Sequence, residues 1–268
     1  MTLKEMVRSK QHQGFSTLIA ESLVGQEILL QAIKKSKIVD KTLIKGGVLM
    51  YNITKNNRRA SRDLDFDLIR YDIKNNESID AFIMLLNKSV NQLKIDRIGN
   101  IEELNQEDYK GKRVFVRISD PSYSFTIKLD IGVHTLFAIE QDEMEFNIGL
   151  DGSKVVLKIN PVEQVIAEKL YSLAKLGVVS TRFKDLYDVY YLLKNYRYNK
   201  KIIVKCLELL VGYGKNNIKD IYELIDIIVD VLNDNFWRKN FDTSNTNWLE
   251  IQDNQLIIDT IINFVETL

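Results

Sequence analysis

Acidic residues at alternate positions form the segment of this chain that most directly suggests chemistry. Residues 63–68 read Asp-Leu-Asp-Phe-Asp-Leu. In a β-strand, Asp63, Asp65 and Asp67 share one face and the apolar residues share the other. Carboxylates crowded on one face repel each other, and a divalent cation that prefers oxygen ligands, such as Mg²⁺, relieves that repulsion. The alternative is a half-buried strand with a solvated acidic face.

A second alternating segment carries one more aspartate. Residues 125–131 read Phe-Thr-Ile-Lys-Leu-Asp-Ile, so the apolar residues share one face and Lys128 and Asp130 share the other. If this strand lies in the same sheet as Asp63 and Asp65, Asp130 completes a triad of carboxylates. Such a triad can hold two metal ions about 4 Å apart for in-line displacement at a phosphorus atom.

A glycine pair, Gly46-Gly47, precedes both acidic segments. Glycine lets backbone amides approach a phosphate closely, and a helix that begins just after the pair adds the positive end of its dipole. A simple turn is the alternative for the pair taken alone. Strand parity places Ser61 on the same face as Asp63, and basic residues including Arg59 lead into the strand.

The second half of the chain contributes Lys169, which lies on or beside the apolar stripe of a predicted helix. Its ammonium either reaches out to water or points at an anionic group in a cleft. Asp185 and Asp188 lie one turn apart on the next predicted helix, and Arg182 precedes them. Helix capping by Thr181 and Asp185 is the competing explanation for that cluster.

Together these motifs resemble those of known nucleotide-transferring enzymes. Gly46-Gly47, the segment from Arg59 to Phe66 and the run Lys128-Leu129-Asp130 resemble the polymerase-β-type nucleotidyltransferase superfamily. A narrower resemblance, to the AbiEii/AbiGii toxin family, rests on four motifs in order: Lys45-Gly46-Gly47, Ser61-x-Asp63-Leu64-Asp65, Glu168-Lys169-Leu170 and Arg182-x-Lys184-Asp185-Leu186-Tyr187-Asp188.

The resemblance implies a metal-dependent nucleotidyltransferase that moves a nucleoside monophosphate from an NTP to an acceptor hydroxyl, for which the 3′ end of a tRNA is a candidate. It implies Mg²⁺ or Mn²⁺ as cofactor and a cognate antitoxin, encoded by an adjacent gene, as partner of this type IV toxin. The implied site residues are Asp63, Asp65 and Asp130 as catalytic metal ligands, Lys169 and Asp185 as further catalytic residues, and Gly46, Gly47, Arg59, Ser61, Lys169 and Arg182 as nucleotide contacts.

These residues must be positioned by an α+β fold. Apolar spacing predicts helices over residues 15–39 and 78–93, and alternation predicts strands over 42–44, 63–69, 113–118, 125–133 and 155–159. After Pro161 the spacing is helical to the end. We therefore expect a nucleotidyltransferase domain over residues 1–160, built on a mixed sheet with flanking helices, and a helical domain over 161–268 that completes the active-site cleft.

Composition limits the cellular location and the kinds of partner that this protein can have. The single cysteine excludes an internal disulfide, and no apolar run approaches the roughly 20 residues that cross a bilayer. No apolar signal segment opens the chain, so we expect a cytoplasmic protein without a membrane partner. Net charge is zero, but residues 161–205 hold nine basic and four acidic side chains. That segment can carry a local polyanion site, or it can be an ordinary solvated surface.

Three other functions compete with an RNA-modifying toxin. The first is a small-molecule nucleotidyltransferase of the antibiotic-modifying kind. The second is a nucleotide-binding regulatory protein without turnover, which predicts Mg²⁺-dependent nucleotide binding but no pyrophosphate release. A structural interaction protein would bind no nucleotide at all.

Overall fold

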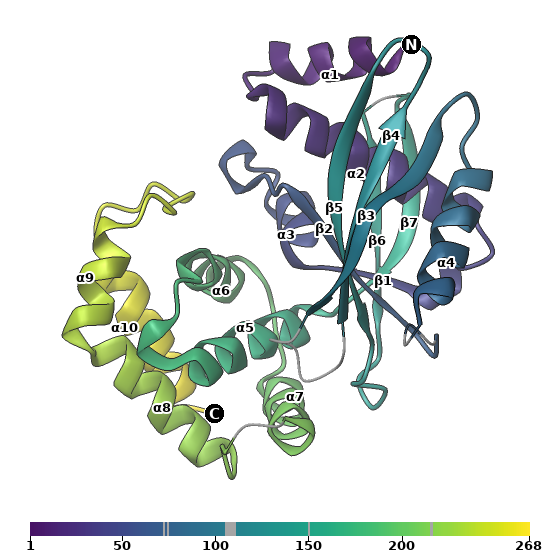
Figure 1. The fold of residues 1–268 in the computed structure, drawn as a ribbon. Coiled ribbons are helices and arrows are strands. Elements are labelled where there is room, and N and C mark those ends of the chain that lie inside the picture. The colour runs from purple at the N-terminus through teal and green to yellow at the C-terminus, as the bar shows by residue number, and fades with distance from the viewer. Residues whose placement is uncertain (72, 74, 105–110, 150, 215–216) are drawn as a thin grey trace. The chain divides into compact units, whose positions relative to one another are not determined.

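The computed structural model describes residues 1–71, 73, 75–104, 111–149, 151–214 and 217–268. These residues form two compact units, each of which is described separately below (Figure 1). The first unit contains Met1–Thr135 and Gln141–Ile159, and the second contains Leu136–Glu140 and Asn160–Leu268. The second unit therefore begins where the sequence pattern becomes helical, and it also takes in a short segment from the first half of the chain.

The first unit contains a seven-stranded mixed sheet with helices. Its helices are α1 (Leu3–His12), α2 (Thr17–Lys35), α3 (Gly46–Thr54) and α4 (Asn76–Lys88), with 3-10 turns η1 (Val39–Lys41) and η2 (Asn57–Arg59). Its strands are β1 (Thr42–Lys45), β2 (Asp63–Leu68), β3 (Lys94–Leu104), β4 (Gly111–Ser119), β5 (Ser124–Val133), β6 (Asp142–Ile148) and β7 (Ser153–Ile159). The predicted fold class, a mixed sheet with flanking helices followed by a helical region, is confirmed.

The strand order is β3-β4-β5-β2-β1-β7-β6, which places β2 near the middle of the sheet. Strand β2 runs parallel to β5 and antiparallel to β1. Residues 65–68 of β2 therefore have a register partner on both sides, whereas Asp63 and Leu64 are paired only with β5. The side chains around the β2 aspartates thus come from β1 and β5.

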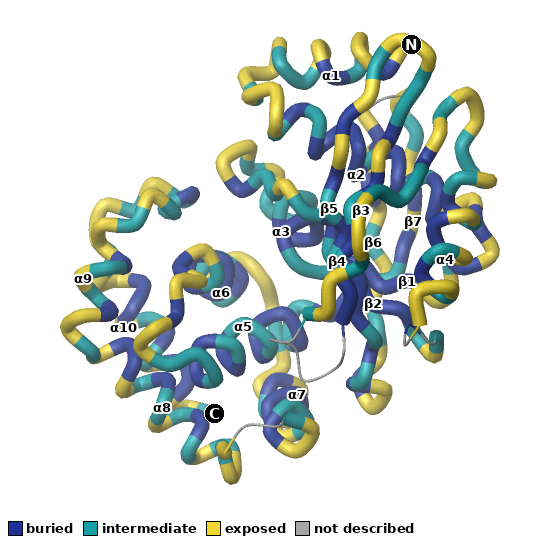
Figure 2. The backbone as a smooth tube through the Cα atoms, viewed as in Figure 1, coloured by how far each residue is buried: buried dark blue, intermediate teal, exposed yellow. Residues whose placement is uncertain are grey.

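Helices α2 and α4 cover the apolar face of this sheet. Phe66 of β2 stacks on Phe82 of α4 with ring centroids 5.2 Å apart. Helix α2 approaches so closely that a Cβ atom on Gly25 would lie 3.0 Å from Phe125 and 3.1 Å from Ile127. These four aromatic and aliphatic side chains are buried, and Figure 2 shows buried stretches along the strands of the sheet and along α2. Because the apolar residues of β2 fill this core, its aspartates must project from the opposite face.

Three elements differ from the sequence expectation. The polar N-terminus forms helix α1, which begins with a capping box between Thr2 and Glu5. That Thr-x-x-Glu spacing was the available signal. Strand β3 was not expected, because most of its residues are polar and exposed or half-exposed, as befits an edge strand. The helix predicted over 78–93 ends earlier, at Lys88.

The second unit is helical. It contains α5 (Val162–Leu176), the 3-10 turn η3 (Gly177–Val179), α6 (Phe183–Asn195), α7 (Lys200–Tyr213), α8 (Ile221–Asn233), α9 (Asn235–Thr243) and α10 (Asn254–Val265). An aromatic cluster joins α6 to α9, in which Phe183, Trp237 and Phe241 lie with ring centroids 5.3 to 5.7 Å apart. Within the described ranges, no helix is long and apolar enough to cross a membrane.

The segment Leu136–Glu140 belongs to the helical unit because it contacts residues of that unit. Lys205 Nζ on α7 donates a hydrogen bond of 2.9 Å to the carbonyl of Ala138. Leu136 and Ile139 are buried. A boundary read from helical spacing misses this segment because it contains no periodic element of its own.

Helix α1 is attached to the sheet through Asp120, in the turn between β4 and β5. Asp120 Oδ2 accepts a hydrogen bond of 2.7 Å from the Leu3 amide, and Oδ1 accepts from the Ser122 and Tyr123 amides. These donors, led by the Leu3 amide, lower the pKa of Asp120 to about 2. The charged form of Asp120 is thus the form that holds α1.

We predict that this attachment weakens in acid. The folded-state pKa of Asp120 lies below the value of about 3.9 for an unfolded aspartate, so its contribution is complete above about pH 5 and is lost as the pH falls toward 2. Asp120→Asn should lower the melting temperature at neutral pH, and the difference from the parent protein should shrink on acidification. The control is Asp96→Asn, on exposed strand β3. A difference that stays constant between neutral and acidic pH contradicts this assignment.

Candidate active site

The acidic face of β2 is the candidate active site. Asp63 and Asp65 project from the face opposite the buried Leu64 and Phe66. The parallel register between β2 and β5 pairs Asp65 with Asp130. The structure therefore brings three of the predicted site residues, from two strands, onto one patch of one face.

Two of these carboxylates are bound by basic side chains from neighbouring positions. Lys128, the register partner of Asp63, places its Nζ 2.7 Å from Asp63 Oδ2. Arg113 on β4 is the register partner of Asp130, and its guanidinium donates two hydrogen bonds, of 2.8 and 2.9 Å, to the two carboxylate oxygens. This bidentate pair raises the pKa of Arg113 and holds Asp130 in one orientation.

Asp67, the third aspartate of β2, has a different environment. Its side chain is only 5% exposed, and Lys45 Nζ lies 2.7 Å from its Oδ1. Lys45 is the last residue of β1. Asp67 is therefore a buried carboxylate at the edge of the patch, paired with a lysine of the neighbouring strand.

Asp65 is the carboxylate of the patch without an ion-pair partner among the described residues. It accepts a hydrogen bond of 3.3 Å from the Gly47 amide. Burial, followed by the charge of Asp130 and more weakly that of Asp63, raises its pKa to about 6, while the Gly47 amide and Lys45 lower it. The negative charge of Asp65 is thus opposed by its surroundings, which is where a further cation would be most stabilising.

The glycine pair lies against this carboxylate. Gly46 begins α3 with a φ of 63°, and a Cβ atom there would lie 2.1 Å from Asp65 Oδ2. A Cβ atom on Gly47 would lie 2.3 Å from Ser61 Oγ and 3.6 Å from an Arg59 guanidinium nitrogen. The structure therefore gathers these five predicted residues, and both glycines are required by space.

Gln26 of α2 is a positioning residue that sequence reasoning missed. It is buried, and its side-chain nitrogen donates hydrogen bonds to the carbonyls of Ser61 and Asp63, at 2.9 and 3.2 Å. These bonds fix the chain where it enters β2. A glutamine on the core-facing stripe of an apolar helix was the available signal, since a buried polar side chain needs partners.

The other predicted site residues lie in the helical unit. Lys169 Nζ on α5 binds the carboxylates of Asp185 and Asp188 on α6, at 2.8 Å from Asp188 Oδ2. Asp188 is fully buried. Arg182 is exposed at the N-cap of α6 and makes no side-chain capping bond there. Asp185 lies in the first turn of α6, as the capping alternative expects, but no side chain among the described residues caps this helix by a hydrogen bond and the Asp185 carboxylate binds Lys169.

The donor set suits a hard divalent cation, although the described residues contain no preformed group of three or more His, Cys, Asp or Glu side chains around a common point. Lys128 and Arg113 bind two of the three carboxylates instead. Carboxylate oxygens are the ligands that Mg²⁺ prefers. Asp65 is half-buried and forms no ion pair within the described ranges, so it provides the position where the residues fit such an ion.

A glycine pair at a helix start, an Asp-x-Asp strand and a parallel strand with a third aspartate define the class of nucleotidyltransferase-fold proteins. Within that class, the chain belongs to the AbiEii family. The family model, described as the nucleotidyl transferase AbiEii toxin of type IV toxin–antitoxin systems, matches residues 28–253. This match spans both compact units.

Among solved structures, the crystal structure of JHP933 from Helicobacter pylori is similar, with a TM-score of 0.44 and 20% sequence identity over 91% of each chain. No curated protein matches the chain.

We predict that Gly46→Ala damages the site because of space as well as backbone conformation. Left-handed backbone alone costs a non-glycine residue about 1–2 kcal/mol, and the clash with Asp65 adds about 1–3 kcal/mol. The matched control is Gly99→Ala, where φ is 67° but nothing lies within 4 Å of the new Cβ. Urea unfolding should show a larger loss of stability for Gly46→Ala. Equal losses in the two variants would show that the close approach to Asp65 does not matter.

Proposed function

We propose that this protein transfers a nucleoside monophosphate from an NTP to an acceptor hydroxyl, with Mg²⁺ or Mn²⁺ as cofactor and release of pyrophosphate. One observation carries the proposal. Asp65, a carboxylate whose charge is not paired, lies beside Asp130 and against the glycines that begin α3. Family membership supports the same chemistry.

The site divides naturally into a metal part and a phosphate part. Asp63, Asp65 and Asp130 would hold the cation, which, when bound, stabilises negative charge on the phosphoryl oxygens. Gly46 and Gly47 offer the amides at the start of α3 to the triphosphate, where the helix dipole is positive.

In the proposed reaction, the oxygen of the acceptor hydroxyl attacks the α-phosphorus of the NTP. A new oxygen–phosphorus bond forms, the bond from the α-phosphorus to the bridging oxygen breaks, and pyrophosphate leaves with the electron pair. The hydroxyl proton passes to the Asp130 carboxylate, which Arg113 keeps in place. Ser61, close to Gly47, and Arg59, which is buried beside it, would contact the nucleotide phosphates.

The contacts to phosphate that the resemblance implies for Lys169 and Arg182, and a catalytic role for Asp185, stay predictions. Lys169 is already neutralised by two aspartates within its own unit. A direct role in charge stabilisation therefore requires that a phosphate compete with Asp185 for its ammonium. Arg182, exposed beside this cluster, forms no ion pair with a carboxylate among the residues that the structure describes.

We further propose that the protein is the toxin of a type IV pair, that a cognate antitoxin from an adjacent gene opposes it in the cytoplasm, and that the acceptor is the 3′ end of a tRNA. Incubation with each labelled NTP and total RNA tests this. Label in the tRNA fraction supports the proposal. Pyrophosphate release with a small hydroxylated acceptor but not with RNA would favour the small-molecule enzyme instead, and nucleotide binding without release would favour a regulatory protein.

We predict that Asp63→Ala abolishes both transfer and cellular toxicity while the fold persists. Asp63 is one-third exposed, so its removal leaves no cavity in the core. Transfer of label to RNA, colony formation on induction and the melting temperature are the measurements. Asp96→Ala, an aspartate on β3, is the control and should retain both activities. Undiminished toxicity from well-expressed Asp63→Ala protein would reject the mechanism.

We also predict that Lys128 competes with the cation for Asp63. Removal of its ammonium in Lys128→Met should tighten Mn²⁺ binding about tenfold, equivalent to about 1.4 kcal/mol. Electron paramagnetic resonance of free Mn²⁺ measures this without any turnover. Lys154→Met, which removes an ion-paired lysine from β7, is the matched control and should change nothing. Unchanged or weaker binding in Lys128→Met contradicts the competition.

A further inference from the structure

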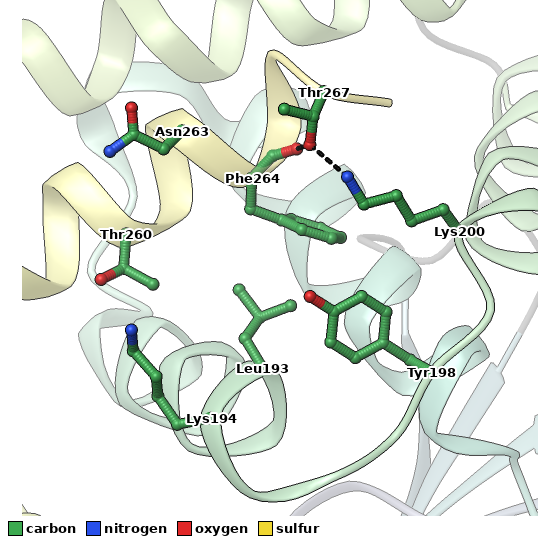
Figure 3. Close-up of a pocket in the computed structure, with 8 residues that line it drawn as sticks. All are labelled: Leu193, Lys194, Tyr198, Lys200, Thr260, Asn263, Phe264 and Thr267. Carbon is green, nitrogen blue, oxygen red and sulfur yellow. Dashed lines mark hydrogen bonds between the residues drawn. The ribbon is translucent and has the colours of Figure 1, made fainter.

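The helical unit contains a pocket that the proposed catalytic chemistry does not use. Its volume is about 320 Å³. It lies between the end of α6, the segment that leads into α7, and the end of α10 (Figure 3). The lining residues are Leu193, Lys194, Tyr198, Lys200, Thr260, Asn263, Phe264 and Thr267. Every one of them belongs to the same compact unit.

The pocket carries positive charge at two places and no acidic lining residue. Figure 3 shows the Lys194 ammonium on the side of Thr260, and the Lys200 ammonium on the side of Thr267. Lys200 Nζ donates a hydrogen bond of 2.6 Å to Thr267 Oγ1. Neither lysine forms an ion pair with a carboxylate in the part of the chain that the structure describes, unlike Lys169 of the same unit. Lys194 Nζ lies 5.7 Å from the centroid of the Tyr190 ring and Lys200 Nζ 5.8 Å from that of Phe264, and neither contact neutralises the positive charge that an anion would meet.

Aromatic surface lies between the two ammonium groups. The rings of Tyr198 and Phe264 meet edge to face, with centroids 5.5 Å apart and an interplanar angle of 86°. Phe264 is buried, whereas Tyr198 is half-exposed and points its hydroxyl toward the middle of the pocket (Figure 3). An aromatic face beside basic groups is the combination that binds single-stranded nucleic acid, because bases stack while phosphates pair with cations.

We propose that this pocket binds one nucleotide of single-stranded RNA, with its base against Tyr198 and the phosphates on either side of it at Lys194 and Lys200. Two separated cations fit a nucleotide within a strand, which has a phosphate at each end. Four of the eight lining residues, including both lysines, come from the segment 161–205, which contains nine basic and four acidic residues. The inference rests on the proposed function, since it gives the RNA acceptor a second contact outside the catalytic patch.

A different role for the two lysines predicts a different result. Lys194 lies in the last turn of α6, and Lys200 contacts Thr267 just beyond the end of α10. Cations at helix C-termini stabilise helices by interacting with the dipole. If this is their whole role, replacing them lowers the melting temperature and leaves RNA binding unchanged.

Fluorescence anisotropy of a labelled single-stranded RNA oligonucleotide on the full chain tests the proposal. Measurement without NTP and with a metal chelator makes the outcome independent of transfer, which pyrophosphate release by the parent protein tests separately. For the double variant Lys194→Gln/Lys200→Gln we expect about tenfold weaker binding. The slope of log affinity against log salt concentration should fall by about 1.4, or about 0.7 for each lost phosphate contact. The control is Lys219→Gln/Lys239→Gln, which removes the same charge elsewhere in the unit.

The base contact has its own pair of variants. Tyr198→Leu should weaken RNA binding about tenfold, whereas Tyr198→Phe, which keeps the ring, should bind within about twofold of the parent protein. Tyr222→Leu on exposed α8 is the control. Three results would overturn the proposal: equal losses in the two double variants, unchanged RNA binding in Lys194→Gln/Lys200→Gln, or a free mononucleotide that competes as well as RNA does.

Discussion

Electrostatic repulsion on one face of β2 is the constraint around which the first unit is organised. Four carboxylates, from Asp63, Asp65, Asp67 and Asp130, lie on this face, and three cations, from Lys45, Lys128 and Arg113, are paired with three of them. With four negative and three positive groups, the face has one negative charge in excess, and Asp65 is the carboxylate that has no paired cation among the described residues. The sheet order makes this arrangement possible, because Lys45 comes from β1 on one side of β2, Lys128 comes from β5 on the other, and Arg113 comes from β4 beyond β5.

Strand parity was sufficient to predict much of this patch. Alternation placed the aspartates of β2 opposite the core, and the same argument put Asp130 on the matching face of β5. The partnership of Arg113 with Asp130 was not accessible in that way. It depends on the hairpin register, which pairs Ser119 with Ser124 across the turn at Asp120. If the turn changed the register by one residue, the Arg113 side chain would project from the apolar face of the sheet, away from Asp130.

The helical unit was predictable as helix but not as a set of contacts. Apolar spacing located α5 and α6, and the spacing of Asp185 and Asp188 predicted that they share a side of α6. That both carboxylates bind Lys169 depends on how two helices pack, which periodicity does not encode. The pocket at Lys194 and Lys200 was hidden for the same reason, since its walls come from residues about 70 positions apart in the chain.

The segment Leu136–Glu140 changes how the two units are connected. The chain passes from one unit to the other after Thr135, returns after Glu140 and passes again after Ile159. Three covalent links therefore join the units, and no single proteolytic cut can release either of them intact. Cleavage at the start of α5 would leave Leu136 and Ile139, both buried among the helices, attached to the sheet fragment. The sheet unit and the helical unit therefore stay connected through residues 136–140 even when the chain is cut after Ile159.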